Sequence, residues 1–92
     1  MSTMIVTMTL DPQQRDAAER HLREDVAAWA KSRPGFVSGR WLCSDDGTKG
    51  VGVVTFASAA DAAAAALGPR SSPGGPAWSI DSVEVLQEVA QA

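Results

Sequence analysis

One histidine and three tryptophans are the side chains of this sequence best suited to chemistry on a small organic molecule. An imidazole gains and loses a proton near neutral pH, so His21 is the candidate catalytic general base, for instance for a phenolic proton. Asp25 follows His21 by four residues, about one helical turn. The alternative interpretation is an exposed or Asp-paired histidine that takes no part in catalysis.

The tryptophans are candidates for contact with an apolar substrate. Trp29 falls on the apolar stripe of a predicted helix, where an indole more often packs in the core than contacts a ligand. Trp41 and Trp78 fall on predicted strands, and each lines either a cavity or a subunit interface. Arg40, on the opposite strand face to Trp41, suits an anionic substrate or a salt bridge across a dimer. Cys43 is expected to be a small buried apolar side chain.

The charge balance and the missing motifs exclude several other functions. Eight Lys and Arg against eleven Asp and Glu give a net charge of -3, so we expect neither a nucleic-acid nor a membrane partner. The sequence has no glycine-rich phosphate loop, no Ser-His-Asp set and no cluster with metal-ligand spacing, so no metal is expected. A single cysteine and the lack of a signal-like N-terminus favour a cytoplasmic location.

The first part of the chain predicts a strand and then an amphipathic helix. Residues Met4–Leu10 place apolar side chains at every second position, which is the period of a strand. Asp11 suits a helix N-cap, Pro12 the first helical position, and Gln14 the third position of a capping box. The helix lasts about five turns, until Arg33-Pro34-Gly35 ends it. Its apolar stripe consists of Ala18, Leu22, Val26 and Trp29.

The middle of the chain predicts a hairpin and a second helix. Phe36–Cys43 and Val51–Ala57 have the composition of strands, and the short connection with Asp46-Gly47 forces them to pair antiparallel. Ala59–Leu67 is a helix capped by Ser58 and closed by Gly68-Pro69. Its many alanines let it lie close to a sheet.

The last part predicts a loop and a strand. Arg70–Ala77 is too rich in Ser, Pro and Gly for regular structure. Trp78–Val89 is a strand with a change of phase near Ser82 that indicates a bulge. The order is therefore βαββαβ, and residues 1–92 are expected to form a single α+β domain of ferredoxin-like fold. Right-handed crossovers place both helices on one face of a four-stranded antiparallel sheet.

The other face of this sheet is expected to be too apolar for water. Whichever face the helices cover, the other face keeps either Phe36 with Leu42 or Val37 with Trp41. It also keeps one apolar pair of the third strand. A second copy of the sheet, packed face to face, would bury about 1,500 Å² and complete an α/β barrel. We therefore expect a homodimer. The alternative is a monomer whose last strand and 70–77 loop fold back over the sheet.

Four segments resemble the dimeric α/β-barrel superfamily, and specifically its antibiotic biosynthesis monooxygenase (ABM) type of domain. They are Arg33-Pro34-Gly35-Phe36, Gly39-Arg40-Trp41-Leu42, Asp46-Gly47 and Val53-Val54-Thr55-Phe56-Ala57-Ser58. The resemblance covers nearly the whole chain, although none of the segments is specific alone. It implies paired ferredoxin-like subunits, each with a cavity between sheet and helices. Some such proteins oxidise polycyclic phenols without metal or flavin, some degrade haem, and many have no known activity.

This chain departs from the family pattern at several positions, and these departures reduce the number of activities that we expect of it. Where haem-degrading relatives have an Asn on the first strand and a Trp at the end of the third, this chain has Thr7 or Thr9 and Phe56, and its second helix has no His. Haem is therefore not expected, and Thr7 and Phe56 are candidate substrate contacts. The chain also lacks the Tyr and Asn with which monooxygenase relatives hold a phenol, which leaves the three tryptophans and His21.

The resemblance thus implies a cofactor-free monooxygenase, or a related small-molecule enzyme, acting on a hydrophobic aromatic substrate. In it, a base such as His21 promotes a substrate carbanion that itself reduces O₂. The alternative is a non-catalytic dimeric module of the same fold that binds an apolar metabolite or only pairs subunits. The Arg70–Ala77 loop separates the two hypotheses: a loop ordered over a cavity favours the first, whereas a disordered loop beside a filled interior favours the second. The most informative observation is whether a cavity of about 300 Å³ or more lies between sheet and helices, and which tryptophans line it.

Overall fold

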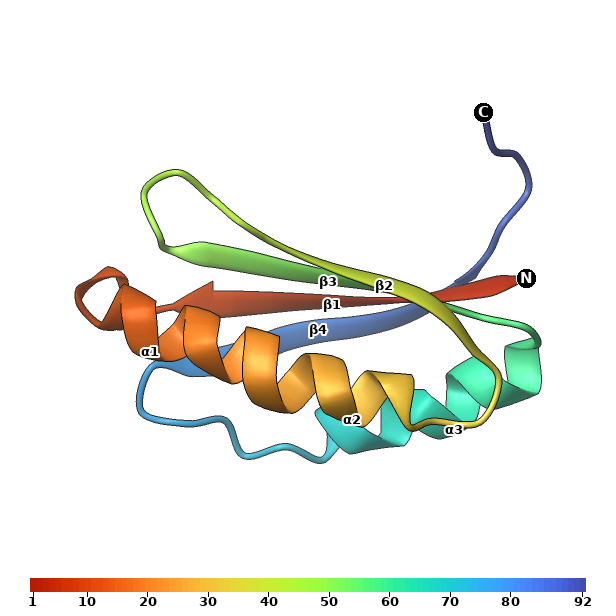
Figure 1. The fold of residues 1–92 in the computed structure, drawn as a ribbon, viewed down its shortest axis with the longest axis horizontal. Helices are drawn as coiled ribbons and strands as arrows, with labels where there is room; N and C mark the ends of the chain where they lie inside the picture. The colour runs from red at the N-terminus through yellow and green to blue at the C-terminus, as the bar shows by residue number, and fades with distance from the viewer.

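A four-stranded antiparallel sheet forms the frame of the computed structural model, which describes residues 1–92 (Figure 1). Its strands are β1 (Ser2–Leu10), β2 (Phe36–Cys43), β3 (Lys49–Phe56) and β4 (Trp78–Gln87). They lie in the spatial order β2-β3-β1-β4, and all helices cover the same face of the sheet. The predicted ferredoxin-like fold is confirmed. No helix is long and apolar enough to span a bilayer.

One long helix follows β1 and packs across the sheet. Its successive segments are η1 (Pro12–Gln14), α1 (Arg15–Arg20), η2 (His21–Val26) and α2 (Ala27–Lys31). The Asp11 carboxylate caps its start, and hydrogen bonds from the Gln14 side chain and the Gln13 backbone lower the pKa of Asp11. The predicted capping box is not complete, because the Asp11 backbone N–H donates to Ala77 and leaves Gln14 to bind the carboxylate.

Segment η2 is a wide π-helical turn that the sequence analysis did not predict. The Ala27 N–H donates to the Leu22 carbonyl five residues earlier, where an α-helix would bond four residues back. Single π turns inside α-helices are frequent at functional sites. This turn carries His21 and Asp25.

The predicted hairpin turn between β2 and β3 is held by the Asp46 carboxylate. Its Oδ1 accepts hydrogen bonds from Thr48 Oγ1 at 2.6 Å and from Ser44 Oγ at 2.8 Å. Gly47 has φ +74, a conformation that glycine adopts without strain. The hydrogen bonds, those from Thr48 and Ser44 first, lower the pKa of Asp46 from 3.8 to about 2.

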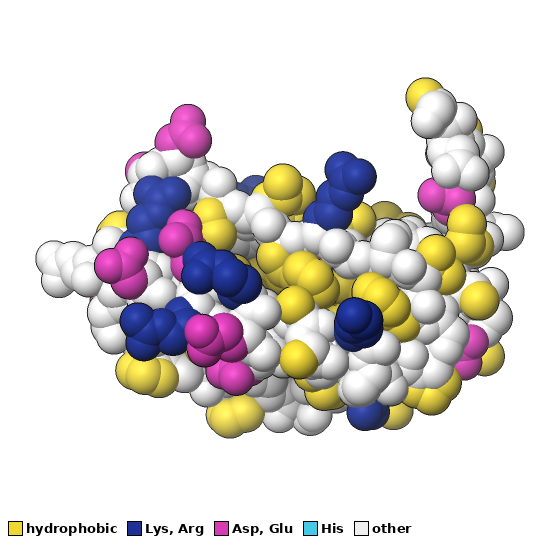
Figure 2. All heavy atoms as spheres, in the orientation of Figure 1, with side chains coloured by type: hydrophobic (Ala, Val, Ile, Leu, Met, Phe, Trp, Pro, Cys, Tyr) yellow, Lys and Arg dark blue, Asp and Glu magenta, His cyan; other side chains and the backbone are white.

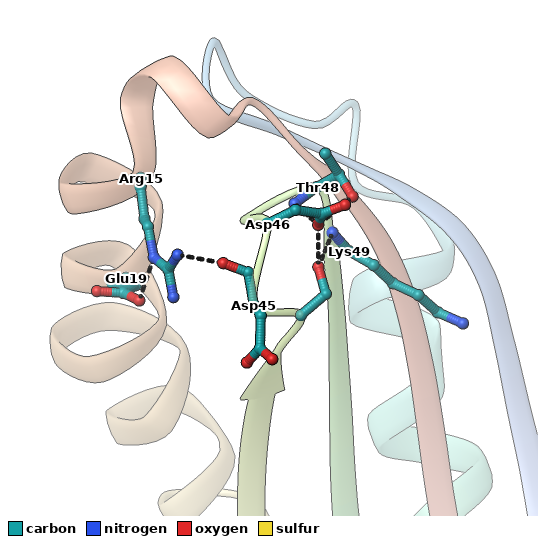
Figure 3. A network of polar contacts seen from close by, with 7 residues as sticks. Arg15, Glu19, Asp45, Asp46, Thr48 and Lys49 are labelled. Atoms are coloured by element: carbon teal, nitrogen blue, oxygen red, sulfur yellow. Dashed lines mark hydrogen bonds and ion pairs between the residues drawn. The ribbon is translucent and has the colours of Figure 1, made fainter.

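The same turn is tied to the long helix (Figure 3). Arg15 Nη1 donates to the backbone oxygen of Asp45 at 2.9 Å, while Arg15 Nε pairs with the Glu19 carboxylate at 3.1 Å. The start of the helix is therefore anchored to the β2–β3 hairpin.

Replacing Asp46 with Asn is expected to lower stability at neutral pH and to have less effect in acid. The folded carboxyl has a depressed pKa, so its contribution is present above 3.8 and is lost as the pH falls toward about 2. Urea midpoints of the wild type and the variant at pH 7, 4 and 2 measure this. A difference between the two midpoints that stays constant down to pH 2 would contradict the assignment.

Helix α3 (Ala59–Arg70) lies close to the sheet because Ala62, Ala65 and Ala66 are buried against it. Ser58 caps its start, as predicted, by accepting from the Asp61 N–H. The predicted end at Gly68-Pro69 is wrong. The helix continues to Arg70 because Ser71 Oγ donates to the carbonyls of Leu67 and Gly68 and satisfies the last turn.

The last strand has the predicted bulge but ends early. Thr7 pairs with Ser82 and Met8 with Ile80, which leaves Asp81 as the extra residue. Pairing ends at Gln87, two residues before the predicted Val89, whose side chain is 91% exposed and packs against nothing. Figure 1 shows the C-terminal end rising away from the sheet on the side opposite the helices.

The core lies between the helices and the inner sheet face, as the strand alternation predicted. Met4, Val54 and Phe56 are its largest fully buried side chains. The prediction that Phe36 and Leu42 lie on the same face of the strand is wrong. A register shift between Phe36 and Ser38 turns Phe36 inward, where its ring meets Phe56 edge-on with centroids 6.5 Å apart. Trp41 shares this inner face, and Leu42 remains outside.

The outer sheet face carries apolar and threonine side chains, with charged ones such as Arg40 and Glu84 among them, and has no cover within the chain. Leu42 and Leu86 are about half exposed, at 55% and 49%. Strand β4 pairs in the plane of the sheet, and the loop before it contributes Ser72 to the helix side. Most of the charged side chains visible in Figure 2 lie toward the end where α1 lies, while two basic side chains stand among the apolar ones in the middle of that view. Residues on the outer face include Ile5, Leu42, Val51, Val53 and Leu86.

Candidate functional site

A cavity of about 350 Å³ lies between the long helix and the inner face of the sheet. This is within the usual range for sites that bind small organic molecules. Ten of its fifteen lining residues are hydrophobic. The lining consists of Met4, Val6, Met8, His21, Leu22, Asp25, Val26, Trp29, Trp41, Val54, Gly68, Pro69, Ser72, Trp78 and Ile80.

His21 and Asp25 form the polar part of the cavity wall. His21 Nδ1 lies 3.0 Å from Asp25 Oδ2. An ionised carboxylate only accepts hydrogen bonds, so Nδ1 carries the proton and Nε2 keeps its lone pair in the neutral ring. The Asp25 side chain is 70% exposed and that of His21 is 32% exposed, which places the pair at the mouth of the cavity. This arrangement suits a base that must exchange its proton with water after each reaction.

The wide turn η2 accounts for much of this wall. Four of its six residues, His21, Leu22, Asp25 and Val26, line the cavity. With regular α-helical spacing, His21 is next to Leu22 along the chain but outside the predicted apolar stripe of Ala18, Leu22, Val26 and Trp29. No residue pattern in the sequence marks the π turn, so this part of the site is visible only in the structure.

Each of the three tryptophans lies against a glycine. A Cβ atom on Gly52 would stand 3.0 Å from Trp41 Nε1, and one on Gly39 would stand 2.7 Å from the Trp41 ring. The Trp41 indole therefore lies over the backbone of β2 and β3 and forms part of the cavity floor. A Cβ on Gly68 would come within 2.8 Å of Trp29 Cζ2, so the absence of a side chain at Gly68 lets α3 approach the Trp29 indole.

The structure brings four of the predicted site residues together and leaves two apart. His21, Trp29, Trp41 and Trp78 all line the cavity. Thr7 projects from the outer sheet face. Phe56 is fully buried in the core beside the cavity and is not part of its wall.

Of three further residues, Arg40 and Cys43 were considered in the sequence and Ser72 was not. Arg40 is exposed on the outer face, where it does not reach the cavity. Cys43 is partly buried against the core, in keeping with a small apolar role. Ser72 was not predicted; it lines the cavity from the loop after α3, and only its position in a polar loop could have drawn attention to it. Nowhere do three His, Cys, Asp or Glu side chains gather as for a metal ion.

Three solved structures share this fold over nearly the whole chain. HapK from Hahella chejuensis is 17% identical with a TM-score of 0.74, and the match covers 100% of this chain and 96% of that one. A monooxygenase from the gene ActVA-Orf6 of Streptomyces coelicolor, in complex with the ligand nanaomycin D, is 22% identical with a TM-score of 0.65, covering 99% and 89%. Rv0793 from Mycobacterium tuberculosis is 17% identical with a TM-score of 0.63, covering 100% and 99%.

The likeness to these proteins is one of fold. No family model matches the sequence, and no curated protein does. At identities of 17% to 22%, similar backbones do not establish a shared reaction. What these proteins share with this chain is the arrangement of strands and helices, and one of the proteins that has it is a monooxygenase.

Proposed function

We propose that this chain, which has the fold of the ABM type of domain, is a cofactor-independent monooxygenase that oxidises a hydrophobic phenol in the cavity. The observation that carries the proposal is the His21–Asp25 pair, with Nδ1 and Oδ2 3.0 Å apart, in the wall of a cavity lined mainly by apolar side chains, three indoles among them. The apolar walls bind an aromatic ring, and the imidazole supplies a base at one edge of it.

The proposed reaction needs only the phenol, O₂ and this base. His21 Nε2 takes the phenolic proton, and the electron-rich phenolate passes one electron to O₂. The substrate radical and superoxide then form a C–O bond at a ring carbon, and the peroxide takes a proton back from His21. Loss of water leaves a carbonyl. For 1-naphthol as the probe, the sum is 1-naphthol plus O₂ giving 1,4-naphthoquinone plus water, so each O₂ places one oxygen atom in each product.

The experiment that tests this function combines binding with oxygen consumption. Titration of 1-naphthol and anthrone under nitrogen, followed by tryptophan fluorescence, measures binding, because three indoles line the cavity. An oxygen electrode then measures turnover in air against a blank without protein. Binding and oxygen uptake together support a monooxygenase. Binding without uptake contradicts it and favours the alternative, a non-catalytic module for an apolar metabolite.

The charge of the cavity predicts a preference for uncharged ligands. No Lys or Arg lines the cavity, whereas Asp25 does. A carboxylate on the ligand would lose hydration without gaining a partner, so 5-hydroxy-1-naphthoate is expected to bind at least about tenfold more weakly than 1-naphthol. The Asp25→Asn variant should reduce this difference. Equal affinity of the wild type for both compounds would contradict the prediction.

We also propose that the working unit is a homodimer joined through the outer sheet faces. The support is the apolar surface of that face, which includes Ile5, Val51 and Val53 and which no other part of the chain covers. A self-complementary sheet face of this kind fits a two-fold interface. The cytoplasmic location expected from the lone Cys43 stays a prediction, and fractionation of the expressing cells would test it.

A further inference from the structure

We propose that Trp78 is a positioning residue for His21, and that Gly75 fixes the place of the Trp78 indole. The inference rests on the proposed role of His21 as the base. It concerns a role that neither the fold nor the resemblance assigns, since Trp78 was expected only to line a cavity or an interface.

The imidazole of His21 has two neighbours that restrain different motions. The His21 and Trp78 rings are stacked, with centroids 4.8 Å apart and planes 14° from parallel. The Asp25 carboxylate bonds Nδ1 at 3.0 Å. A hydrogen bond to Nδ1 restrains the ring at one edge only, and an exposed carboxylate as partner leaves the tilt of the ring plane loosely held. Stacking on a flat indole restrains that tilt, so the two contacts together fix the direction of the Nε2 lone pair.

The Trp78 indole is itself held by a tight turn of the chain. The Gly75 N–H donates to the Trp78 carbonyl at 2.9 Å, which closes the turn just before β4. A Cβ atom on Gly75 would stand 2.7 Å from Trp78 Nε1 and 3.0 Å from Cε2. The indole therefore lies between the bare backbone of Gly75 and the ring of His21.

The backbone of Gly75 does not by itself require glycine. The residues with left-handed φ values are Gly35, Gly47 and Gly74, and Gly75 is not among them. Gly75 is also exposed and does not line the cavity. What the position requires is the absence of a side chain under the indole. A methyl group there must push the Trp78 ring out of the stack, while the Asp25 hydrogen bond to His21 can remain.

The test uses the Gly75→Ala and Trp78→Leu variants, with Trp78→Phe as the conservative replacement. The first readout is the proton NMR spectrum, because a single histidine gives unambiguous ring signals. Protons stacked over an indole are shifted upfield by its ring current. We expect His21 ring signals upfield of free imidazole in the wild type, and their return toward free values in Gly75→Ala and Trp78→Leu. Gly68→Ala is the matched control, because its new methyl meets Trp29 and should leave the His21 signals in place.

The second readout is turnover of 1-naphthol. Gly75→Ala is expected to lower kcat by about tenfold or more, with a smaller change in KM, because a misplaced base slows the reaction more than it weakens binding. Trp78→Phe keeps an aromatic ring and should recover most of the rate. Unshifted His21 signals in the wild type, or signals in well-folded Gly75→Ala that match the wild type, would overturn the proposal. The NMR result needs no substrate, so a failure of this proposal can be told apart from a failure of the proposed monooxygenase function.

Discussion

Replacing His21 with Gln is expected to lower the rate of 1-naphthol oxidation by about a hundredfold to ten-thousandfold, which is the usual contribution of a general base. Gln keeps a polar group of similar size but cannot take the proton. The fluorescence-detected affinity should change little, because most of the cavity wall is apolar. Steady-state oxygen uptake at saturating 1-naphthol measures the effect.

Two variants of neighbouring residues make this result specific. Glu24→Gln alters an exposed carboxylate of the same wide turn that does not line the cavity, so turnover should stay near the wild-type value. Asp25→Asn should lower turnover, because an amide can donate to Nδ1 and stabilise the wrong tautomer of His21. Full activity in well-folded His21→Gln would remove His21 as the base.

Replacing Val51 with Glu is expected to convert a dimer into a monomer. Val51 lies on the outer sheet face, next to Thr7 on β1 and Leu42 on β2. A two-fold axis buries both copies of the new carboxylate in the interface, directly opposite the uncharged Thr7 and Leu42, while the nearest cations on that face, Lys49 and Arg40, lie one step along the strands. Burying a charge with only such diagonal partners costs a few kcal/mol, so the dissociation constant should rise at least about a hundredfold. Light scattering coupled to size exclusion gives the mass.

Leu67→Glu is the matched control for the interface variant. Leu67 is 65% exposed on α3, on the opposite side of the sheet from the outer face, so the same kind of substitution there should leave the dimer intact. A wild-type mass of one chain at micromolar concentration would contradict the interface. So would a Val51→Glu protein that is still a dimer.

The strands and helix starts could be predicted from the sequence because local patterns determine them. The alternation from Met4 to Leu10 fixes which side chains enter the core, and Asp11 and Ser58 cap the helices that follow. The Asp46-Gly47 turn and the bulge beside Ser82 also leave a local mark in the sequence.

The sequence-based prediction failed where a particular hydrogen bond or a packed ring overrides the residue pattern. The turn η2 has no sequence motif, and the register shift after Phe36 reverses the side that its ring faces. Helix α3 passes through Gly68-Pro69 because Ser71 satisfies its last carbonyls. In each case, a hydrogen bond or a packed ring decides the conformation, and its partner is not implied by the residue type alone.

The candidate site was predictable as a set of residue types more than as a geometry. His21 and the tryptophans stand out because the chain has so few other groups for chemistry. The stack of His21 on Trp78 joins residues far apart in the sequence, and only the fold brings them together. Thr7 and Phe56 were predicted only because they stand where relatives of the family have functional residues. Neither reaches the cavity wall.

The fate of labelled oxygen separates a reaction catalysed by His21 from spontaneous oxidation of the phenol. Wild-type protein is given 1-naphthol under ¹⁸O₂, and the quinone and the water are analysed by mass spectrometry. We expect one ¹⁸O atom in each 1,4-naphthoquinone and the other in water, at a rate far above that of His21→Gln. Quinone formed no faster than in the blank without protein, or equally fast with His21→Gln, would contradict the proposed mechanism.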